Sequence, residues 1–318
     1  MNQKAHLAKD LLTEKVERAA ARDGYGKGLV EAGKENKDVV VLCCDLTEST
    51  RSHWFRDKYP DRFIEVGVAE QNMAGIAAGM AITGKVPFCS SYAVFNPGRN
   101  WDQIRVSVGY SNANVKITGA HAGISVGPDG ATHQALEDVA ITRVIPNMIV
   151  VVPCDVHEAR KSTLAIARHV GPAYIRFGRE KTAVMTTSKT PFKLGRAEVF
   201  RQGKKVTIVA CGALVHEAML AAEKLDAEVI NCHTIKPIDK ETIVKSAKKT
   251  GRVVTIEEHQ INGGLGSAVA EVLAENYPVP MRRVGMQDSF GESGDPEELL
   301  TKYKMKKEDI VRAAKQIL

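Results

Sequence analysis

Short runs of β-branched residues recur along this chain, and segments with helical periodicity separate them. The runs in the first half fall at residues 39–44, 62–66, 86–90, 115–119, 149–153 and 173–177. They are almost continuously apolar, which is typical of parallel strands that are covered by helices on both faces. The alternation therefore predicts an α/β protein with mostly parallel sheets flanked by helices.

The alternation is interrupted by a segment that reads KTAVMTTSKTPFK. This segment is rich in Thr, Ser and Lys, contains a proline and lacks a helical period, so it is typical of a linker. Strand-like runs resume beyond it as VTIVACG, AEVINCHTI and RVVTIEEH. We therefore expect two domains, at residues 1–182 and 192–318, joined by a linker at residues 183–191, and the length of 318 residues suits two domains.

Composition excludes several classes of protein. No apolar run approaches the roughly 20 residues that cross a bilayer, and the first 20 residues are expected to form a charged amphipathic helix without a secretory core. The six cysteines lack C-x-x-C spacing, so we expect a reducing cytoplasm, no disulfides and no metal site of this chain's own. The net charge of +6 suits anionic small molecules, whereas an aromatic content of 5% without a stacking series does not suit nucleic acid.

One acid stands at a junction between a strand-like run and a helix. Residues 63–73 read FIEVGVAEQNM, and the Ala- and Gly-rich segment AGIAAGMAITG follows. Glu70 at this junction is expected to be buried, and a buried carboxylate needs a partner, inside or outside the chain. An acid in the first turn of a helix is also favoured by the helix dipole. This segment alone leaves a functional and a structural interpretation open.

Two polar loops follow strands of the first domain, where ligands bind in open parallel sheets. The loop DLTEST, with Asp45 and Ser49, is equally typical of a helix N-cap. The loop SYAVFNPGRNWDQIR places Tyr92 and Phe95 near Arg99. Such aromatic rings can stack on a flat heterocycle, and an arginine can hold a phosphate or carboxylate. Core aromatics beside a surface arginine fit the same pattern.

A third loop, AHAGISVGPDGATHQALED, is rich in glycine and carries His121, Asp129 and His133. The spacing of these three residues does not match a metal site. Two histidines in a polar loop suit proton transfer or contact with sugar hydroxyls better. A long Gly-rich loop inside a compact domain indicates function.

Taken together and in order, these segments resemble the transketolase family. The resemblance rests on DLTEST, EVGVAEQNM, GRNWDQIR, HAGISVGPDGATHQALED, IPNM, VVPCD, YIRFGR and TIKPID, and it extends from about residue 22 to about residue 267. It implies a pyrimidine-binding domain followed by a transketolase C-terminal domain. It also implies a thiamine-diphosphate enzyme of carbohydrate metabolism, in the pentose phosphate pathway, that transfers a two-carbon ketol unit from a ketose phosphate to an aldose phosphate.

The resemblance further implies roles for individual residues. Glu70 matches the glutamate that hydrogen-bonds a ring nitrogen of the cofactor's aminopyrimidine, and it is expected to be catalytic together with His121 and His133. The cofactor-binding residues are expected to be Glu70, Asp45, and either Phe95 or Tyr92 as the ring that stacks on the pyrimidine. The substrate-binding residues are expected to be His121, Asp129 and His133 for the sugar and Arg22, Ser49 and Arg179 for its phosphate, with Arg99 added in relatives that make deoxyxylulose phosphate.

One departure from the family pattern decides the expected assembly. The family's diphosphate and metal motif, G-D-G followed later by paired asparagines, is absent, and the nearest string, Pro128-Asp129-Gly130, belongs to the third loop. The chain therefore resembles the C-terminal half of a split transketolase. We expect it to be active only with a separate N-terminal subunit that binds the diphosphate and Mg2+ or Ca2+, in an α2β2 assembly in which the beta chain also associates with itself.

Three other interpretations remain open. The beta subunit of a 2-oxoacid dehydrogenase shares the A-E-Q helix and the two-domain layout, but it does not require the phosphate clamp of Arg22, Ser49 and Arg179. A deoxyxylulose-phosphate synthase is the second, although EVGVAEQNM and TIKPID are more typical of transketolase. The third is a non-catalytic paralogue that has kept the fold, and the presence of Glu70 and both loop histidines argues against it.

Overall fold

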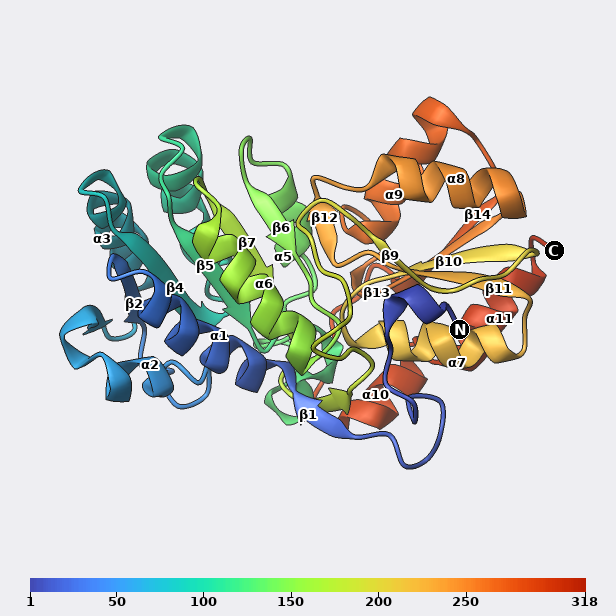
Figure 1. Ribbon diagram of the computed structural model, residues 1–318, viewed down its shortest axis with the longest axis horizontal. Coiled ribbons are helices and arrows are strands. Elements are labelled where there is room, and N and C mark those ends of the chain that lie inside the picture. The colour runs from blue at the N-terminus through green and yellow to red at the C-terminus, as the bar shows by residue number, and fades with distance from the viewer.

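The computed structural model describes all 318 residues, which form two α/β domains and a small two-stranded sheet (Figure 1). The first domain is built on a seven-stranded sheet with the strand order β12-β6-β7-β5-β4-β2-β3. All neighbouring strands in it run parallel except β12 and β6. Its strands are β2 (Val39–Cys43), β3 (Phe63–Glu65), β4 (Val86–Tyr92), β5 (Lys116–Ala120), β6 (Ile149–Val151), β7 (Ala173–Arg176) and β12 (Thr234–Lys236).

Helices cover both faces of this sheet, which explains why its strands are apolar at nearly every position. One face, in front in Figure 1, carries α1 (Ala21–Glu35) and α6 (Val156–Arg168), with α2 (His53–Lys58) packed against α1. The opposite face carries α3 (Glu70–Ile82), α4 (Trp101–Gln103), a π-helix (Ile104–Tyr110) and α5 (Asp138–Arg143). The strands β2, β5 and β7 are buried along their whole length.

The second domain repeats this arrangement on a smaller scale. Its sheet has the order β14-β13-β10-β11-β9, and only β9 is antiparallel to its neighbour. The strands are β9 (Glu198–Arg201), β10 (Val206–Ala210), β11 (Ala227–Asn231), β13 (Val253–Gln260) and β14 (Met281–Met286). The helices are α7 (Val215–Glu223), α8 (Lys240–Thr250), α9 (Leu265–Asn276), α10 (Pro296–Lys302) and α11 (Lys307–Lys315). No helix of either domain has the length and apolar character that a membrane crossing needs.

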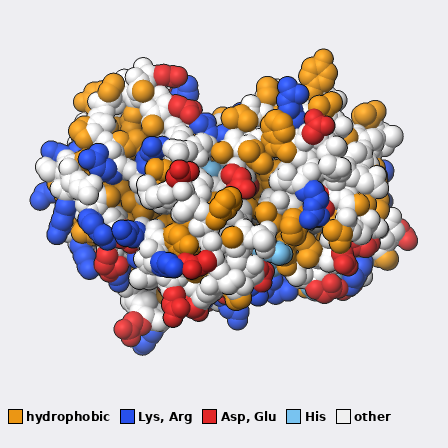
Figure 2. Space-filling model, turned by 180° about the vertical axis from the view of Figure 1, so that it is seen from behind, with side chains coloured by type: hydrophobic (Ala, Val, Ile, Leu, Met, Phe, Trp, Pro, Cys, Tyr) orange, Lys and Arg blue, Asp and Glu red, His pale blue; other side chains and the backbone are white.

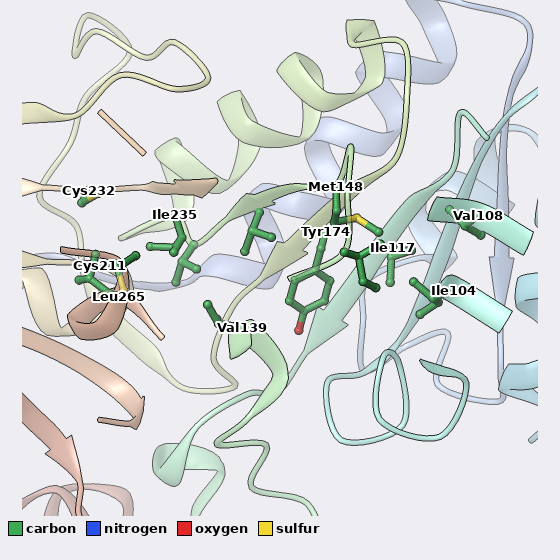
Figure 3. Close-up of a cluster of buried hydrophobic side chains, with 14 of the residues drawn as sticks. Ile104, Val108, Ile117, Val139, Met148, Tyr174, Cys211, Cys232, Ile235 and Leu265 are labelled. Atoms are coloured by element: carbon green, nitrogen blue, oxygen red, sulfur yellow. The ribbon is translucent and has the colours of Figure 1, made fainter. Parts of the chain in front are cut away.

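The two domains share one hydrophobic core. The largest cluster of buried apolar side chains runs from the π-helix and α3 of the first domain to α8 and α9 of the second. Figure 3 shows part of this cluster, from Ile104 and Val108 past Tyr174 to Cys211 and Leu265. A continuous core of this kind fixes how the domains sit against each other.

A strand from the second half of the chain completes the sheet of the first domain. The run AEVINCHTI, expected as one strand, is divided: β11 ends at Asn231 in the second sheet, and β12 begins at Thr234 in the first. There β12 pairs antiparallel with β6. The expectation of one strand is wrong because both halves of the run are almost wholly buried, and the sequence pattern does not reveal a change of sheet.

The expected amphipathic helix at the N-terminus is also wrong. Residues 3–5 form a single 3-10 turn, and β1 (Arg18–Ala20) pairs antiparallel with β8 (Lys181–Ala183). The segment is held against the second domain, since Asn2 N donates to Phe200 O at 2.9 Å and Leu11 is fully buried there. These tertiary contacts replace the helix that the local pattern favours.

Candidate active site

The residues that the sequence singles out gather at one edge of the seven-stranded sheet. The strands β2, β4, β5 and β7 are neighbours and run parallel. Their carboxyl ends therefore meet at the same edge, where open α/β sheets bind ligands. The predicted residues that end or follow these strands are Asp45, Tyr92, His121 and Arg179.

Glu70 is the first residue of α3, and its side chain is only 1% exposed. It accepts a hydrogen bond from Ser91 Oγ at 3.1 Å and one from Arg99 Nη1 at 2.6 Å. The position of this acid therefore agrees with both the structural and the functional interpretation. It stands in the first turn of a helix, where the dipole favours a negative charge, and it is a buried carboxylate with charged and polar partners.

Arg99 connects Glu70 to the aromatic loop. Its guanidinium carbon lies 4.4 Å from the centre of the Phe95 ring, a cation–π distance. The Arg99 side chain is 42% exposed, so solvent reaches the pair from the arginine side. No sequence pattern indicates this ion pair, because Arg99 follows Glu70 by 29 positions and the intervening loop is positioned by tertiary contacts.

Two asparagines hold the aromatic loop in place, and sequence reasoning missed both. Asn96 Nδ2 donates to Cys89 O and Thr118 O at 2.9 and 3.1 Å. Asn100 Nδ2 donates to Asn96 Oδ1 at 3.0 Å and to the backbone oxygen of Glu70 at 3.1 Å. The loop is thus tied to the strands beneath it and to the start of α3. The four-residue spacing of these amides beside a Pro-Gly turn was the available signal.

Four rings form one cluster beside this loop. Tyr92 stacks on His121 with 4.1 Å between ring centres, and it lies nearly parallel to Phe95 at 6.1 Å. Phe95 meets His133 edge to face at 5.4 Å. Both candidate aromatic residues and both loop histidines are therefore in contact, as the third loop folds back over the end of β4.

His121 is held as a neutral imidazole. Burial, together with the positive charges of Arg22 and Arg179, lowers the pKa of His121 to about 3. Arg22 Nη1 lies 3.3 Å from His121 Nε2 and also donates to Ser49 O at 3.1 Å. A guanidinium can only donate, which assigns the imidazole proton to Nδ1.

The Nδ1 atom of His121 is buried and has no partner within the chain. A buried donor of this kind suits a hydrogen bond to a ligand. The His121 backbone has a φ of 51°, which is unusual for a residue other than glycine. Conformations of this kind cluster at functional sites.

Arg179 and Asp129 meet at the far side of the third loop. Arg179 Nη1 donates to Val126 O at 3.1 Å and lies 3.4 Å from Asp129 Oδ1. His133 is half-buried, and its Nδ1 lies 2.9 Å from Thr132 Oγ1. Asp129 is exposed. The loop therefore presents an ion pair next to the ring cluster.

The two candidate residues of the DLTEST loop, Asp45 and Ser49, make backbone contacts. Asp45 is exposed, and its backbone N–H donates to Glu65 Oε1 at 2.7 Å. Thr47 Oγ1 donates to the other oxygen of Glu65 at 2.8 Å. Ser49 accepts from Arg22 through its backbone oxygen. No group of three or more His, Cys, Asp or Glu side chains in the structure is arranged to hold a metal ion.

Comparison with known families matches nearly the whole chain. Residues 17–184 match the family "Transketolase, pyrimidine binding domain", and residues 195–310 match "Transketolase, C-terminal domain". The two matches lie in the same order as the two domains of the structure.

Individual relatives give the same result. A "Putative transketolase C-terminal section" from Methanocaldococcus jannaschii is 45% identical, over 92% of this chain and 94% of the relative. The "6-deoxy-6-sulfo-D-fructose transketolase subunit SqwH" from a Clostridium species is 44% identical, over 95% of this chain and 96% of the relative. A solved structure described as "Split gene transketolase, inactive beta4 tetramer" is 47% identical, with a TM-score of 0.88 over 94% of this chain and 98% of that one. The chain therefore belongs to the transketolase family, and it is similar to the C-terminal chains of split transketolases.

Proposed function

We propose that this chain is the C-terminal subunit of a split, thiamine-diphosphate-dependent transketolase. It transfers a two-carbon ketol unit from a ketose phosphate to an aldose phosphate, and it acts only together with a separate N-terminal subunit. The observation that carries the proposal is the buried Glu70 carboxylate beside the ring cluster of Tyr92, Phe95, His121 and His133. The names of the relatives, "C-terminal section" and "subunit", support the division into two chains.

The residues present fit one end of the cofactor. Glu70 offers a buried carboxylate for a ring nitrogen of the aminopyrimidine, and Tyr92 or Phe95 offers a ring for its face. When bound, thiamine diphosphate supplies the carbanion chemistry of the ketol transfer, and the protein supplies orientation and electrostatics. The diphosphate and its Mg2+ or Ca2+ need several oxygen ligands, which the proposal assigns to the partner subunit because the G-D-G and paired-asparagine motif is absent from this chain.

The remaining site residues suit a phosphorylated sugar. His121 is neutral, with an unpartnered Nδ1 proton available for a hydroxyl or carbonyl oxygen of the substrate. Arg22 and Arg179 are two guanidiniums near His121, and Ser49 adds a hydroxyl, so that together they can clamp an anionic group. His133 and Asp129 complete the sugar-binding side of the proposed site.

An unpartnered helix face supports the need for other chains. Helix α3 carries no polar side chain after Asn72, yet Val68 just before it and Ile82 at its end are 68% and 78% exposed. A Cβ placed on Gly75 or Gly79 meets nothing within 4 Å. Figure 2 shows hydrophobic side chains exposed on the side of the molecule that carries α3. An exposed apolar face next to a site marks a protein contact, which agrees with self-association of the beta chain in an α2β2 assembly.

Reconstitution tests the proposed function. The purified chain is assayed with thiamine diphosphate and Mg2+, alone and with the N-terminal subunit, on xylulose 5-phosphate plus ribose 5-phosphate. The proposal expects turnover only in the presence of both chains. Turnover by this chain alone would contradict the division of the site. Turnover of pyruvate plus glyceraldehyde 3-phosphate in place of the two sugars would contradict the reaction.

The identity of the donor sugar is tested in the same assay. One relative is named for a sulfonated sugar, 6-deoxy-6-sulfo-D-fructose. Phosphate and sulfonate are both anionic groups that paired guanidiniums can hold. A panel of phosphorylated and sulfonated ketoses, ranked by kcat/KM, therefore identifies the donor.

A further inference from the structure

The third loop of the candidate site is held in place by contacts from the second domain. This loop, residues 121–135, connects β5 to α5 and contains a 3-10 segment, Ile124–Asp129. Its neighbours across the domain boundary are α10, β13 and the residues that precede α10. The loop carries His121, Asp129 and His133, so whatever holds it also places these side chains.

One carboxylate of the second domain reaches directly into this loop. Glu258 of β13 is 6% exposed, and its Oε1 accepts a hydrogen bond from the backbone N–H of Ser125 at 2.5 Å. The approach is so close that a Cβ on Gly123 would lie 2.4 Å from the same oxygen. Gly123 also has a φ of 91°, which only glycine adopts readily. The glycine of the loop and the acid of the second domain therefore fit each other.

Further contacts from the second domain reinforce this hold. Gln134 Nε2 donates to Ile124 O at 3.0 Å and, across the domain boundary, to Glu292 O at 2.9 Å. Gly127 lies against Pro296 and Gly130 against Ser293, with no room for a Cβ at either glycine. The loop is thus held at its start, middle and end by two segments of the second domain, β13 and residues 292–296, each more than 100 residues away in the chain.

Glu258 is itself fixed by a buried arginine of the first domain. Arg176 Nη2 donates to the backbone oxygen of Glu258 at 2.6 Å, and Arg176 Nε donates to Asp138 Oδ2 at 2.9 Å. Burial raises the pKa of Glu258, while the charge of Arg176 and the hydrogen bond from Ser125 act in the opposite direction. The guanidinium therefore compensates in part for the burial of two acids next to the loop.

We propose that Glu258 is a positioning residue, through which the C-terminal domain sets the conformation of the loop that carries His121 and His133. The role of these histidines toward a sugar rests on the proposed function, but the contact by which Glu258 holds the loop does not depend on it. The C-terminal domain thereby contributes to the site without touching cofactor or substrate.

Three variants separate positioning from simple structural damage. Glu258→Ala removes the acceptor of the Ser125 amide, whereas Glu258→Gln keeps an oxygen that can accept it. Glu257→Ala is the matched control, because Glu257 is the adjacent residue of β13, is equally buried at 2% exposure, and accepts from Leu265 N and Gly266 N at the start of α9. It makes no hydrogen bond to residues 121–135.

The first measurement is hydrogen–deuterium exchange of the isolated chain. In Glu258→Ala, peptides covering residues 121–135 are expected to exchange about tenfold faster or more, since a buried amide has lost its partner. In Glu258→Gln and Glu257→Ala the same peptides are expected to exchange at nearly the rate of the unaltered chain. Unchanged exchange in Glu258→Ala, or an equal increase in Glu257→Ala, would overturn the proposal.

The second measurement is made on the complex reconstituted with the N-terminal subunit. Glu258→Ala is expected to raise KM for the ketose phosphate about tenfold, with a smaller change in kcat, and Glu258→Gln is expected to restore most of the loss. Equal kinetics for Glu258→Ala and the unaltered chain would overturn the proposal. If the unaltered complex lacks transketolase activity, the proposed function fails, while the exchange result on the loop still stands.

Discussion

At the level of single residues, the contacts of two arginines define the candidate site. Glu70 is neutralised in the free chain by Arg99, and His121 is kept neutral by burial beside Arg22. The sequence singled out Glu70, Arg99 and His121 from polar motifs at the ends of apolar runs, whereas Arg22 came only from the resemblance to transketolases. It did not predict that Arg99 lies on Glu70, since that contact depends on how the aromatic loop is folded by Asn96 and Asn100.

Replacing Arg99 by methionine is expected to destabilise the isolated chain by about 1–2 kcal/mol. The buried Glu70 carboxylate then keeps only the hydrogen bond from Ser91, and the value is reduced because Arg99 is partly exposed to solvent. Urea unfolding measures the change. Arg105→Met, at an exposed arginine without an ion pair, is the control and is expected to have little effect. Equal stabilities of the two variants would show that Arg99 does not stabilise Glu70.

The lowered pKa of His121 predicts a dependence of stability on pH. The folded chain leaves His121 unprotonated down to a pH of about 3, whereas the unfolded chain binds a proton below about 6.5. The contribution of His121 to the free energy of unfolding is therefore fully present above pH 6.5 and is lost as the pH falls toward 3. Between pH 7 and pH 5.5 this residue lowers the free energy of unfolding by about 1 kcal/mol.

The comparison of variants isolates this contribution. His121→Gln is expected to lose about 1 kcal/mol less than the unaltered chain when urea unfolding at pH 7 is compared with pH 5.5. His157→Gln, at an exposed histidine, is the matched control. A loss in His121→Gln as large as that of the unaltered chain would contradict a buried neutral imidazole.

At the level of elements, the sequence predicted the fully buried strands, but it did not predict that a strand pairs in the sheet of the other domain. The runs at β2, β4, β5 and β7 are apolar because both faces are covered, so periodicity and composition located them. The strand β12 was missed, because nothing in the run AEVINCHTI indicates that the chain moves to another sheet. Helix α3 is a further case, since its uniform apolarity indicates burial although one face is open.

The open face of α3 gives a prediction at this scale. Gly79→Leu is expected to leave the isolated chain folded, because a side chain at Gly79 meets no neighbouring atoms. The same change is expected to weaken association with other chains about tenfold or more, as it places a bulky group in a close helix contact. Analytical ultracentrifugation measures the assembly, with Lys245→Leu on the exposed side of α8 as the control. If Gly79→Leu assembles like the unaltered chain, the open face of α3 is not the contact between chains.

At the level of the whole molecule, the two domains are joined by more than a linker. They share a core, the second half of the chain donates β12 to the first sheet, and Glu258 and Gln134 tie the third loop to the second domain. The order of the two domains was visible in the sequence, and so was the absence of the diphosphate motif. The contacts that join the two domains were not visible in the sequence, because they form between residues far apart in the chain.

The proposed role of Glu70 is to contribute to a site that another subunit completes. Its most direct test is the turnover of the complex reconstituted with the N-terminal subunit, thiamine diphosphate and Mg2+, carrying Glu70→Gln or the matched surface change Glu48→Gln. This role predicts that Glu70→Gln lowers kcat about 10²- to 10⁴-fold, as expected for a group that takes part in proton transfer, while Glu48→Gln retains full activity. Full turnover of the Glu70→Gln complex would contradict it.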